Sequence, residues 1–278
     1  MEIMTTEMVT VEKRTPEKRT PEKRTLERNT TDVVLLTRLS NGVGEITMQD
    51  TATKNSFSPE IVHGLRECFR CVAEDDTYKV VILTGYGNYF LSGGTKERLL
   101  QLQGEKGATG FVLDLIRLIV DCPIPVIAAM QGHGIGAGFV LGLYADLIIL
   151  ARESIYTTNY LKYGFTPGMG ATIVIPAKFG PLLGQEMLFT ARNYPGGELA
   201  QRGVACPVLP RPEVLPYARQ MAQEMADAPR PSLINLKQLL AAPWRDTLYA
   251  KVEHEMAMLA KTIQQPEIAS RIETRFGQ

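Results

Sequence analysis

The sequence is poor in cysteine and has no long apolar run. Its 278 residues include only 4 cysteines, which are too scattered to form the disulfide framework of a small secreted domain. No stretch approaches the roughly 18 apolar residues of a membrane-spanning helix, and the segment before residue 31 lacks the apolar centre of a signal peptide. These absences predict a cytoplasmic protein without disulfides and without a membrane partner.

The chain also has no net charge and no recognisable metal motif. Its 30 Lys and Arg residues balance 30 Asp and Glu residues, so the overall charge gives no argument for binding nucleic acid or an anionic surface. Cys68 and Cys71 form one C-x-x-C pair inside a predicted helix, but no second pair and no histidine pair lies at the spacing of a zinc site. We therefore expect no metal and no nucleic-acid partner.

Residues 1–31 differ in composition from everything that follows. Over residues 12–25 they contain the five-residue repeat EKRTP, with alternating charges, helix-breaking prolines and almost no apolar side chains. Such a segment cannot bury enough surface to offset the entropy that it would lose on ordering. We predict a disordered charged leader over residues 1–31 and a folded domain over residues 32–278.

From residue 33 onward, short apolar strands alternate with amphipathic helices. Strands are expected at 33–36, 43–48, 80–84, 126–130 and 147–150, with one helix starting at Pro59 after the N-cap Ser58 and another at 111–120. This alternation predicts an α/β fold with parallel strands. Beyond residue 180 the pattern is helical, with helices expected at 182–190, 197–202, 213–226, 232–240 and 247–263, the last two separated at Pro243.

Two glycine-rich turns each follow a buried strand. Their central residues are Ser92, Gly93 and Gly94 in the first turn and Gly136, Ala137 and Gly138 in the second. Glycine has no Cβ, so a ligand can approach the backbone N–H groups closely. The run after Gly138 is expected to be helical, which leaves the N–H groups around Ala137 unpaired at the positive end of a helix. Two donors from different strands can converge on one oxygen atom as an oxyanion hole.

Three stretches carry a resemblance to the crotonase superfamily of enoyl-CoA hydratases and isomerases. They are NYFLSGGTKE (88–97), CPIPVIAAMQGHGIGAGFVLGLYADLIILARES (122–154) and KYGFTPGMGAT (162–172). The resemblance covers roughly residues 32–278 and implies an α/β fold, a crotonase spiral of ββα repeats over about 32–195 with a helical C-terminal region over about 196–278. It also implies a homotrimer or hexamer that needs no cofactor, in which the backbone N–H groups of Gly94 and Ala137 stabilise a thioester enolate.

The sequence departs from the family pattern at two positions. The hydratases that it resembles carry two glutamates that hold the water added to the double bond, and Val140 and Tyr160 occupy those positions here. Val140 cannot transfer a proton, and Tyr160, with an ordinary pKa of about 10, is a poor substitute for a carboxylate base near neutral pH. Simple hydration is therefore not expected.

Within the superfamily, the chain is most similar to the subfamily that acts in polyketide β-branching. The stretches that carry this similarity are GGTKE, MQGHGIGAGF and SIYTTNYLKYGFTPGMGAT. Members of that subfamily decarboxylate a 3-methylglutaconyl group carried on the phosphopantetheine of an acyl carrier protein. Loss of carbon dioxide sends an electron pair to the thioester oxygen, so the dienolate needs oxyanion donors but no activated water. The resemblance therefore implies a crotonase-type decarboxylase with an acyl carrier protein as partner, or acyl-CoA as an alternative carrier.

Several other side chains are candidates for holding the carboxylate and returning the proton. Lys96 and Arg98 follow Gly94 closely, and their charge suits a carboxylate. His133 lies inside the second turn with an ordinary pKa of about 6.5, which suits proton donation, although it can instead shape the loop by bonding to backbone. The catalytic candidates are thus Gly94, Ala137, Lys96, His133 and Tyr160, and the substrate-binding candidates are Ser92, Gly93, Arg98, Gly136, Gly138 and Lys162.

The remaining predictions concern residues around the site. Tyr89, Tyr163, Phe165 and Met169 are expected to form walls of the cavity rather than to react. His254 is expected at the surface, on the charged face of the last helix with Lys251 and Glu255, and this helix carries Leu259 where relatives can carry a histidine.

Two competing interpretations stay open. The first keeps the fold and the oxyanion hole but shifts a double bond or adds water to an acyl-CoA. The second is a scaffold without activity that binds a carrier protein, which the missing glutamates would permit.

Overall fold

The structure is a computed structural model that describes residues 32–102 and 108–276. The predicted leader over 1–31 lies outside the described residues and stays a prediction. Among the described residues, no helix has the length and apolar character needed to span a bilayer.

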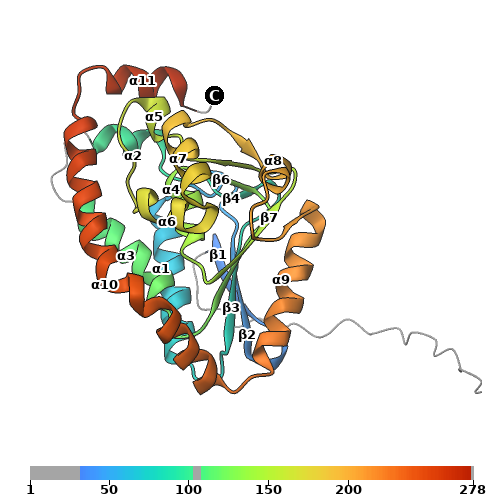
Figure 1. Cartoon of the computed structure of the whole chain (residues 1–278). Coiled ribbons are helices and arrows are strands. Elements are labelled where there is room, and N and C mark those ends of the chain that lie inside the picture. Colours follow the sequence, from blue (N-terminus) through green and yellow to red (C-terminus); the bar gives the residue numbers. More distant parts are fainter. Residues whose placement is uncertain (1–31, 103–107, 277–278) are drawn as a thin grey trace, which may run out of the picture.

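Two sheets form the core of the domain (Figure 1). In spatial order, the larger sheet consists of β1 (Val34–Arg38), β2 (Val43–Met48), β3 (Val80–Thr84), β5 (Val126–Met130), β7 (Leu147–Ala151) and β10 (Val208–Leu209). The smaller sheet consists of β4 (Tyr89–Leu91), β6 (His133–Ile135), β8 (Ile155–Thr157) and β9 (Tyr194–Pro195). β1 and β2 form the predicted antiparallel hairpin, and the other neighbours of the larger sheet are parallel.

Three parallel strands of the larger sheet, β3, β5 and β7, are each followed by a short strand of the smaller sheet and then by a helix. The helices are η1 (Ser40–Gly42), α1 (Pro59–Glu74), α2 (Lys96–Gln101), α3 (Ala108–Val120), α4 (Ala137–Leu143), α5 (Tyr160–Tyr163), α6 (Ala171–Phe179), α7 (Pro181–Thr190), α8 (Gly196–Gln201), α9 (Arg211–Ala226), α10 (Arg230–Thr262) and α11 (Ile268–Arg275). This order confirms the expected spiral of ββα units, because β3, β5 and β7 each lead into β4, β6 and β8. The exact boundary between spiral core and helical C-terminal part stays a prediction.

The larger sheet is covered on both faces. Figure 1 shows α9 on one side and α1 with α3 on the other. Successive residues of β3 alternate between these layers: Val81 and Leu83 belong to the core with α1 and α3, whereas Val80 and Ile82 pack toward α9. All residues of β3 are buried, as expected for a parallel strand with helices on both faces.

The start of α1 was predicted correctly. Pro59 is its first residue, and the hydroxyl of Ser58 accepts a hydrogen bond from the N–H of Ile61 at 3.2 Å. This side-chain cap satisfies one of the backbone donors that a helix start leaves open.

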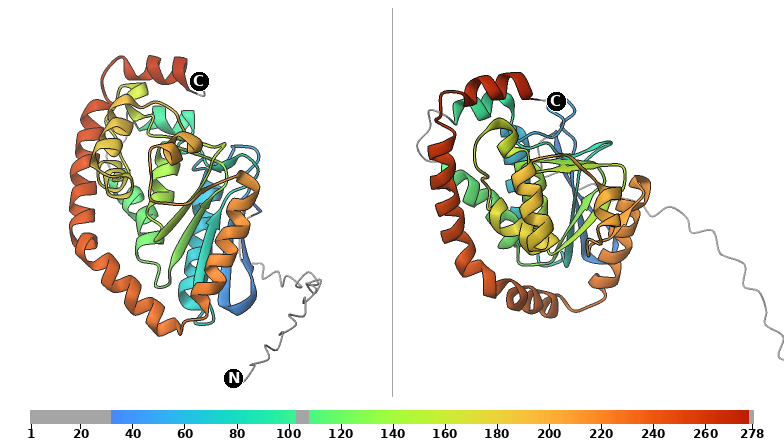
Figure 2. Two further views of the ribbon diagram at one scale, coloured as in Figure 1. Left: turned by 45° about the vertical axis from the view of Figure 1, so that its right-hand side comes forward. Right: turned by 45° about the horizontal axis from the view of Figure 1, so that its top comes forward.

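The prediction of a helix break at Pro243 was wrong. The structure has one continuous helix, α10, which Figures 1 and 2 show as a long curved element wrapping along α3 and α6. A proline removes one helical hydrogen bond and favours a bend, but the helix continues when packing on both sides holds it. Here Leu233 and Leu248, one on each side of Pro243, are both buried.

The placement of Glu255 on a charged outer face was also wrong. His254 and Lys251 are exposed as predicted, but Glu255 is only 6% exposed, and burial raises its pKa. Its carboxylate accepts hydrogen bonds from the hydroxyl of Thr172 at 2.6 Å and the N–H of Ala171 at 3.2 Å. Glu255 thus caps the start of α6 from another helix. The helical spacing of residues in α10 does not reveal this long-range contact.

The ion pair between Glu45 and Arg219 joins β2 to α9, with the carboxylate buried and the guanidinium partly exposed. Glu45 is 4% exposed, and the guanidinium of Arg219 donates to its two carboxylate oxygens at 2.6 and 2.8 Å. Replacing Arg219 by methionine leaves a buried carboxylate without its partner, so we expect the free energy of unfolding to fall by about 3–5 kcal/mol. Urea denaturation followed by circular dichroism measures this loss.

Arg70→Met is the matched control, since Arg70 pairs with Glu67 and Glu74 on an exposed helix face. Its loss should stay below about 1 kcal/mol. Equal losses in the two variants would contradict the assigned role of the Arg219 pair.

Candidate active site

A cavity of about 420 Å³ lies at the ends of the smaller sheet's strands. Its polar lining consists of Thr53, Lys54, Ser56, Ser92, His133, Thr157, Asn159, Lys162 and Asn193. Its apolar and aromatic lining includes Tyr89, Leu99, Ile135, Ile155, Tyr160, Tyr163, Phe165 and Phe276, and its backbone lining includes Gly93, Gly94, Gly136 and Ala137. The two glycine turns therefore meet at one cavity.

The two turns approach each other so closely that they exclude side chains. A Cβ on Gly138 would lie 2.3 Å from the carbonyl oxygen of Leu91 and 2.7 Å from the nitrogen of Gly93. A Cβ on Gly93 would lie 3.5 Å from the nitrogen of Ala137. These distances place the Gly93–Gly94 peptide directly beside the first residue of α4.

The orientation of both candidate donors follows from the planarity of the trans peptide, whose C=O and N–H point in opposite directions. The carbonyl of Gly93 accepts a hydrogen bond from the N–H of Phe57 at 2.8 Å, so the N–H of Gly94 points away from that segment. The carbonyl of Gly136 accepts from Val140 inside α4 at 3.1 Å, so the N–H of Ala137 points out of the helix start.

Neither donor is satisfied by the fold. Within the described chain, the backbone N–H groups of Gly94 and Ala137 have no hydrogen-bond acceptor, and both residues line the cavity. Two unpaired amides from separate turns that face one cavity form the arrangement expected of an oxyanion hole. Negative charge on a ligand oxygen at this point is also favoured by the start of α4.

A hydrogen-bond network holds the second turn against the larger sheet. The side-chain carbonyl of Gln131 accepts from the hydroxyl of Thr84 at 2.9 Å. The backbone carbonyl of Gln131 accepts from the hydroxyl of Ser154 at 3.0 Å and from the guanidinium of Arg211 at 3.1 Å. Gln131 is 8% exposed, and its polar atoms bond inside the protein rather than to a ligand.

His133 lines the cavity as a neutral imidazole. Its Nδ1 accepts a hydrogen bond from the N–H of Ile155 at 2.9 Å, so the ring proton lies on Nε2. Burial, followed by the positive charge of Arg211, lowers the pKa of His133 below its ordinary value. Two interpretations of His133 follow from the sequence, proton donor or a residue that shapes the loop by bonding to backbone. The bond from Ile155 fits the second, and at neutral pH His133 is not an imidazolium.

Tyr160 also lines the cavity, at the position where the hydratases carry a glutamate. Its side chain is 7% exposed, and its hydroxyl has no hydrogen-bond partner within residues 32–102 and 108–276. Burial raises the pKa of Tyr160 further above its ordinary value, so its proton is retained at neutral pH. Lys162, two residues later, lines the same cavity. Val140 is buried inside α4.

Three of the sequence-predicted site residues lie outside the cavity wall. Gly138 is buried where the turns pack together. Lys96 and Arg98 belong to the first turn of α2, and neither is among the described residues that line the cavity. The guanidinium of Arg98 lies 5.8 Å from the centre of the Phe111 ring.

The structure adds lining residues that the sequence did not single out. Lys54 comes from the loop before α1, Asn159 from the start of α5, Asn193 from the loop before β9, and Phe276 from the end of α11. No motif marks these positions, because each reaches the cavity through a contact between distant segments. Of the four predicted wall residues, Tyr89, Tyr163 and Phe165 line the cavity, whereas Met169 does not.

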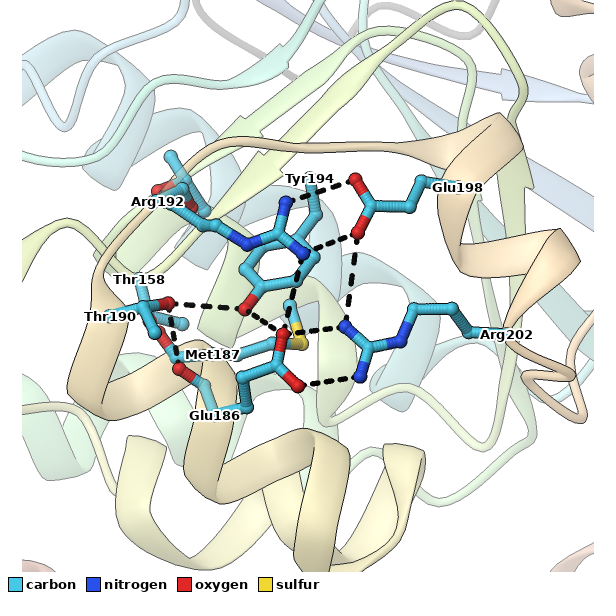
Figure 3. Close-up of polar contacts among 9 residues, drawn as sticks. Thr158, Glu186, Met187, Thr190, Arg192, Tyr194, Glu198 and Arg202 are labelled. Atoms are coloured by element: carbon cyan, nitrogen blue, oxygen red, sulfur yellow. Dashed lines mark hydrogen bonds and ion pairs between the residues drawn. The ribbon is translucent and has the colours of Figure 1, made fainter.

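An ion-pair cluster holds the loop that carries Asn193 (Figure 3). Glu186 of α7 lies at its centre and binds Arg202 through two hydrogen bonds of 2.5 and 2.6 Å. Arg192 pairs with Glu198, and its guanidinium stacks on the ring of Tyr194, 3.8 Å from the ring centre. On the cavity side, the hydroxyl of Thr157 donates to the carbonyl of Arg192 at 2.9 Å. The cluster therefore fixes the backbone on both sides of Asn193.

The cavity offers no obvious metal site. Across the described ranges, no three His, Cys, Asp or Glu side chains come together as possible metal ligands. The lining instead consists of neutral hydroxyls, amides and one imidazole, with Lys54 and Lys162 as its cations. It is suited to a ligand that places its developing negative charge on one oxygen.

Comparisons with known proteins identify relatives over most of the chain. The family model for enoyl-CoA hydratase/isomerase matches residues 38–275. The bacillaene synthase decarboxylase PksI of Bacillus subtilis is 52% identical over 249 residues, which cover 89% of this chain and 99% of that protein.

Solved structures agree with this result. One, from a dehydratase/decarboxylase enzyme couple involved in polyketide β-branching, is 51% identical with a TM-score of 0.86 and covers 89% of this chain and all of the other. The ECH2 decarboxylase domain of CurF from Lyngbya majuscula is 50% identical with a TM-score of 0.83, over 88% of this chain and 99% of that domain.

The ion-pair cluster predicts a specific dependence of stability on pH. Hydrogen bonds, first of all from Arg202, lower the pKa of Glu186 from 4.5 to about 2. A carboxylate whose pKa is depressed by folding stabilises the fold above its ordinary pKa, and this stabilisation is lost as the pH falls toward the folded value. We expect Glu186→Gln to lower the melting temperature at pH 7, and the gap to wild type to close between pH 5 and pH 2.

Thermal denaturation at a series of pH values checks this expectation. Glu224→Gln removes the same charge from α9, away from the cluster, and should change the melting temperature little. A gap between wild type and Glu186→Gln that is as wide at pH 2.5 as at pH 7 would contradict the role of the cluster.

Proposed function

The chain belongs to the enoyl-CoA hydratase/isomerase family, and we propose that it decarboxylates a 3-methylglutaconyl thioester carried on an acyl carrier protein, as a step of polyketide β-branching. It is a close homologue of decarboxylases, which are enzymes of this family. The observation that carries the proposal is the cavity: it combines two unpaired backbone amides with a lining in which, among the described residues, there is no Asp or Glu.

The proposed decarboxylation requires hydrogen-bond donors for the thioester oxygen, and this cavity has two. The bond between C4 and the carboxylate carbon of the substrate breaks, and carbon dioxide leaves. The electron pair forms a C3=C4 double bond, the former C2=C3 pair shifts to C1–C2, and the carbonyl pair moves onto the thioester oxygen. The N–H groups of Gly94 and Ala137 bind this oxygen as its negative charge grows, and one such donor typically lowers the barrier by about 3 kcal/mol.

The proposed decarboxylation also requires no general base to activate water, and the described lining has no carboxylate for that role. Addition of water requires a group that takes a proton from it near neutral pH. Val140 is apolar, and Tyr160 keeps its proton because its pKa is raised. We propose Lys162, which lines the cavity, as the cation that holds the substrate carboxylate, with Ser92, Gly93 and Gly136 shaping the wall around the thioester. Lys96 and Arg98 lie outside that lining and are not part of this proposal.

The remaining parts of the proposal concern the carrier and the assembly. One solved relative, 51% identical, comes from an enzyme couple involved in polyketide β-branching, which supports a carrier-bound substrate over a free acyl-CoA. We propose a cytoplasmic homotrimer or hexamer that receives the substrate on phosphopantetheine.

Product masses test the proposal against its alternatives. The protein is incubated with 3-methylglutaconyl and 3-methylcrotonyl thioesters on acyl carrier protein and on CoA, and the acyl groups are analysed by mass spectrometry. We expect the 3-methylglutaconyl group to lose the mass of carbon dioxide. A gain of the mass of water would identify a hydratase, and an unchanged mass with a moved alkene would identify an isomerase; either outcome contradicts decarboxylation.

Ala137→Pro separates an active enzyme from a scaffold. Proline is tolerated at the first position of a helix, where its missing N–H breaks no helical bond, so the fold of α4 should survive. The variant loses one oxyanion donor, and we expect kcat to fall by about 10²–10³-fold. A scaffold without activity would support the pathway equally well with proline at this position.

A further inference from the structure

Tyr163 is held rigidly in the cavity wall by a stack of three aromatic rings. Its ring is nearly parallel to that of Phe165, with centres 5.8 Å apart and an angle of 20°. The ring of Phe276 also stacks on it, with centres 6.4 Å apart and an angle of 22°. All three residues line the cavity, and Tyr163 is 5% exposed. The position of the Tyr163 hydroxyl is therefore set by packing.

Asn159, one turn earlier, binds this hydroxyl. The side-chain NH₂ of Asn159 donates a hydrogen bond to the hydroxyl oxygen of Tyr163 at 3.3 Å. The amide oxygen of Asn159 lies beside Gly136, 2.7 Å from the point where a Cβ would be, and Gly136 has a φ of 51° that suits glycine. Because Gly136 precedes Ala137, the Asn159–Tyr163 pair lies next to the oxyanion hole.

The hydrogen bond from Asn159 decides where the phenolic proton of Tyr163 points. The oxygen accepts the amide hydrogen, so its own O–H must find a different acceptor. No other hydrogen-bond partner of the Tyr163 hydroxyl exists within the described chain. Since the residue lines the cavity, a bound substrate is available as that acceptor.

We propose that Tyr163, oriented by Asn159, donates the proton that the dienolate takes up after carbon dioxide has left. This inference rests on the proposed function. The O–H bond breaks, a C–H bond forms at C2 or C4 of the dienolate, and the electron pair of the thioester oxygen returns to the carbonyl. The phenolate that remains is stabilised by the N–H of Asn159 and recovers its proton from water, so the reaction consumes one proton for each carbon dioxide released.

Two other candidates in the cavity, His133 and Tyr160, are less suited to this step. His133 is a neutral imidazole, whose Nε2–H is a far weaker acid than a phenol. The hydroxyl of Tyr160 has no donor beside it within the described residues to stabilise a phenolate, and its pKa is raised by burial and by Glu255. Burial raises the pKa of Tyr163 as well, but in the described part of the chain no neighbouring negative charge adds to this shift as Glu255 does at Tyr160.

Tyr163→Phe tests the proposal, since it removes only the hydroxyl and keeps the ring stack. Wild type and variant are given the 3-methylglutaconyl thioester in deuterium oxide, and NMR locates the deuterium at C2 or C4 of the product. We expect wild type to place it at one carbon and the variant at both, with kcat about 100-fold lower and KM within a few-fold of wild type.

Asn159→Leu is the second variant, and it decides the question if Tyr163→Phe does not fold. As a positioning residue, Asn159 should affect the same deuterium distribution and kcat, with less effect than loss of the hydroxyl itself. Tyr249→Phe is the matched control, because that hydroxyl binds Asp121 outside the cavity. Its product and rate should equal those of wild type.

Two results would overturn the inference. One is a Tyr163→Phe enzyme with the rate and deuterium distribution of wild type. The other is a scrambled distribution in Tyr160→Phe alone, which would make Tyr160 the donor. Failure of the proposed function is distinguishable from both, because wild type itself would then release no carbon dioxide.

Discussion

The site depends on the contact between two backbone turns that only glycine permits. The segment Leu91–Gly93 and the start of α4 touch at distances where any side chain on Gly138 would collide with main-chain atoms. This contact places the N–H groups of Gly94 and Ala137 at one cavity, each turned there because the carbonyl of the same peptide is bonded on the opposite side. Main-chain donors have no rotamers to lose, so these two N–H groups are fixed in place before any ligand arrives.

Hydrogen bonds to the larger sheet anchor the second turn, and burial sets the protonation of the residues that line the cavity. The larger sheet anchors the second turn through Gln131, whose side-chain carbonyl and backbone carbonyl both accept hydrogen bonds within the protein. The lining is neutral apart from two lysines, because His133 is unprotonated and the tyrosines keep their protons. In a partly enclosed cavity, hydrogen bonds to one anionic oxygen are stronger than in bulk water.

The sequence predicted the buried framework of the fold well and the remote parts of the site poorly. β3 and β5 match their predicted bounds to the residue, because fully apolar runs between turns leave little freedom. Strands β4, β6 and β8 have only three residues each, which is too short for any periodicity to indicate them. Phe276 stacks on Tyr163 from the far end of the chain, and Glu255 turns inward to cap α6; both depend on tertiary contacts that no local pattern encodes.

The central claim is that two main-chain amides polarise the thioester carbonyl, and isotope-edited infrared spectroscopy tests it most directly. A 3-methylcrotonyl pantetheine thioester labelled with carbon-13 at the carbonyl is bound to the protein, and its carbonyl stretch is compared with that in water. The account predicts a clear shift to lower frequency, because two fixed donors weaken the C=O bond more than water does. A bound carbonyl that absorbs at the frequency of the free thioester in water would contradict it.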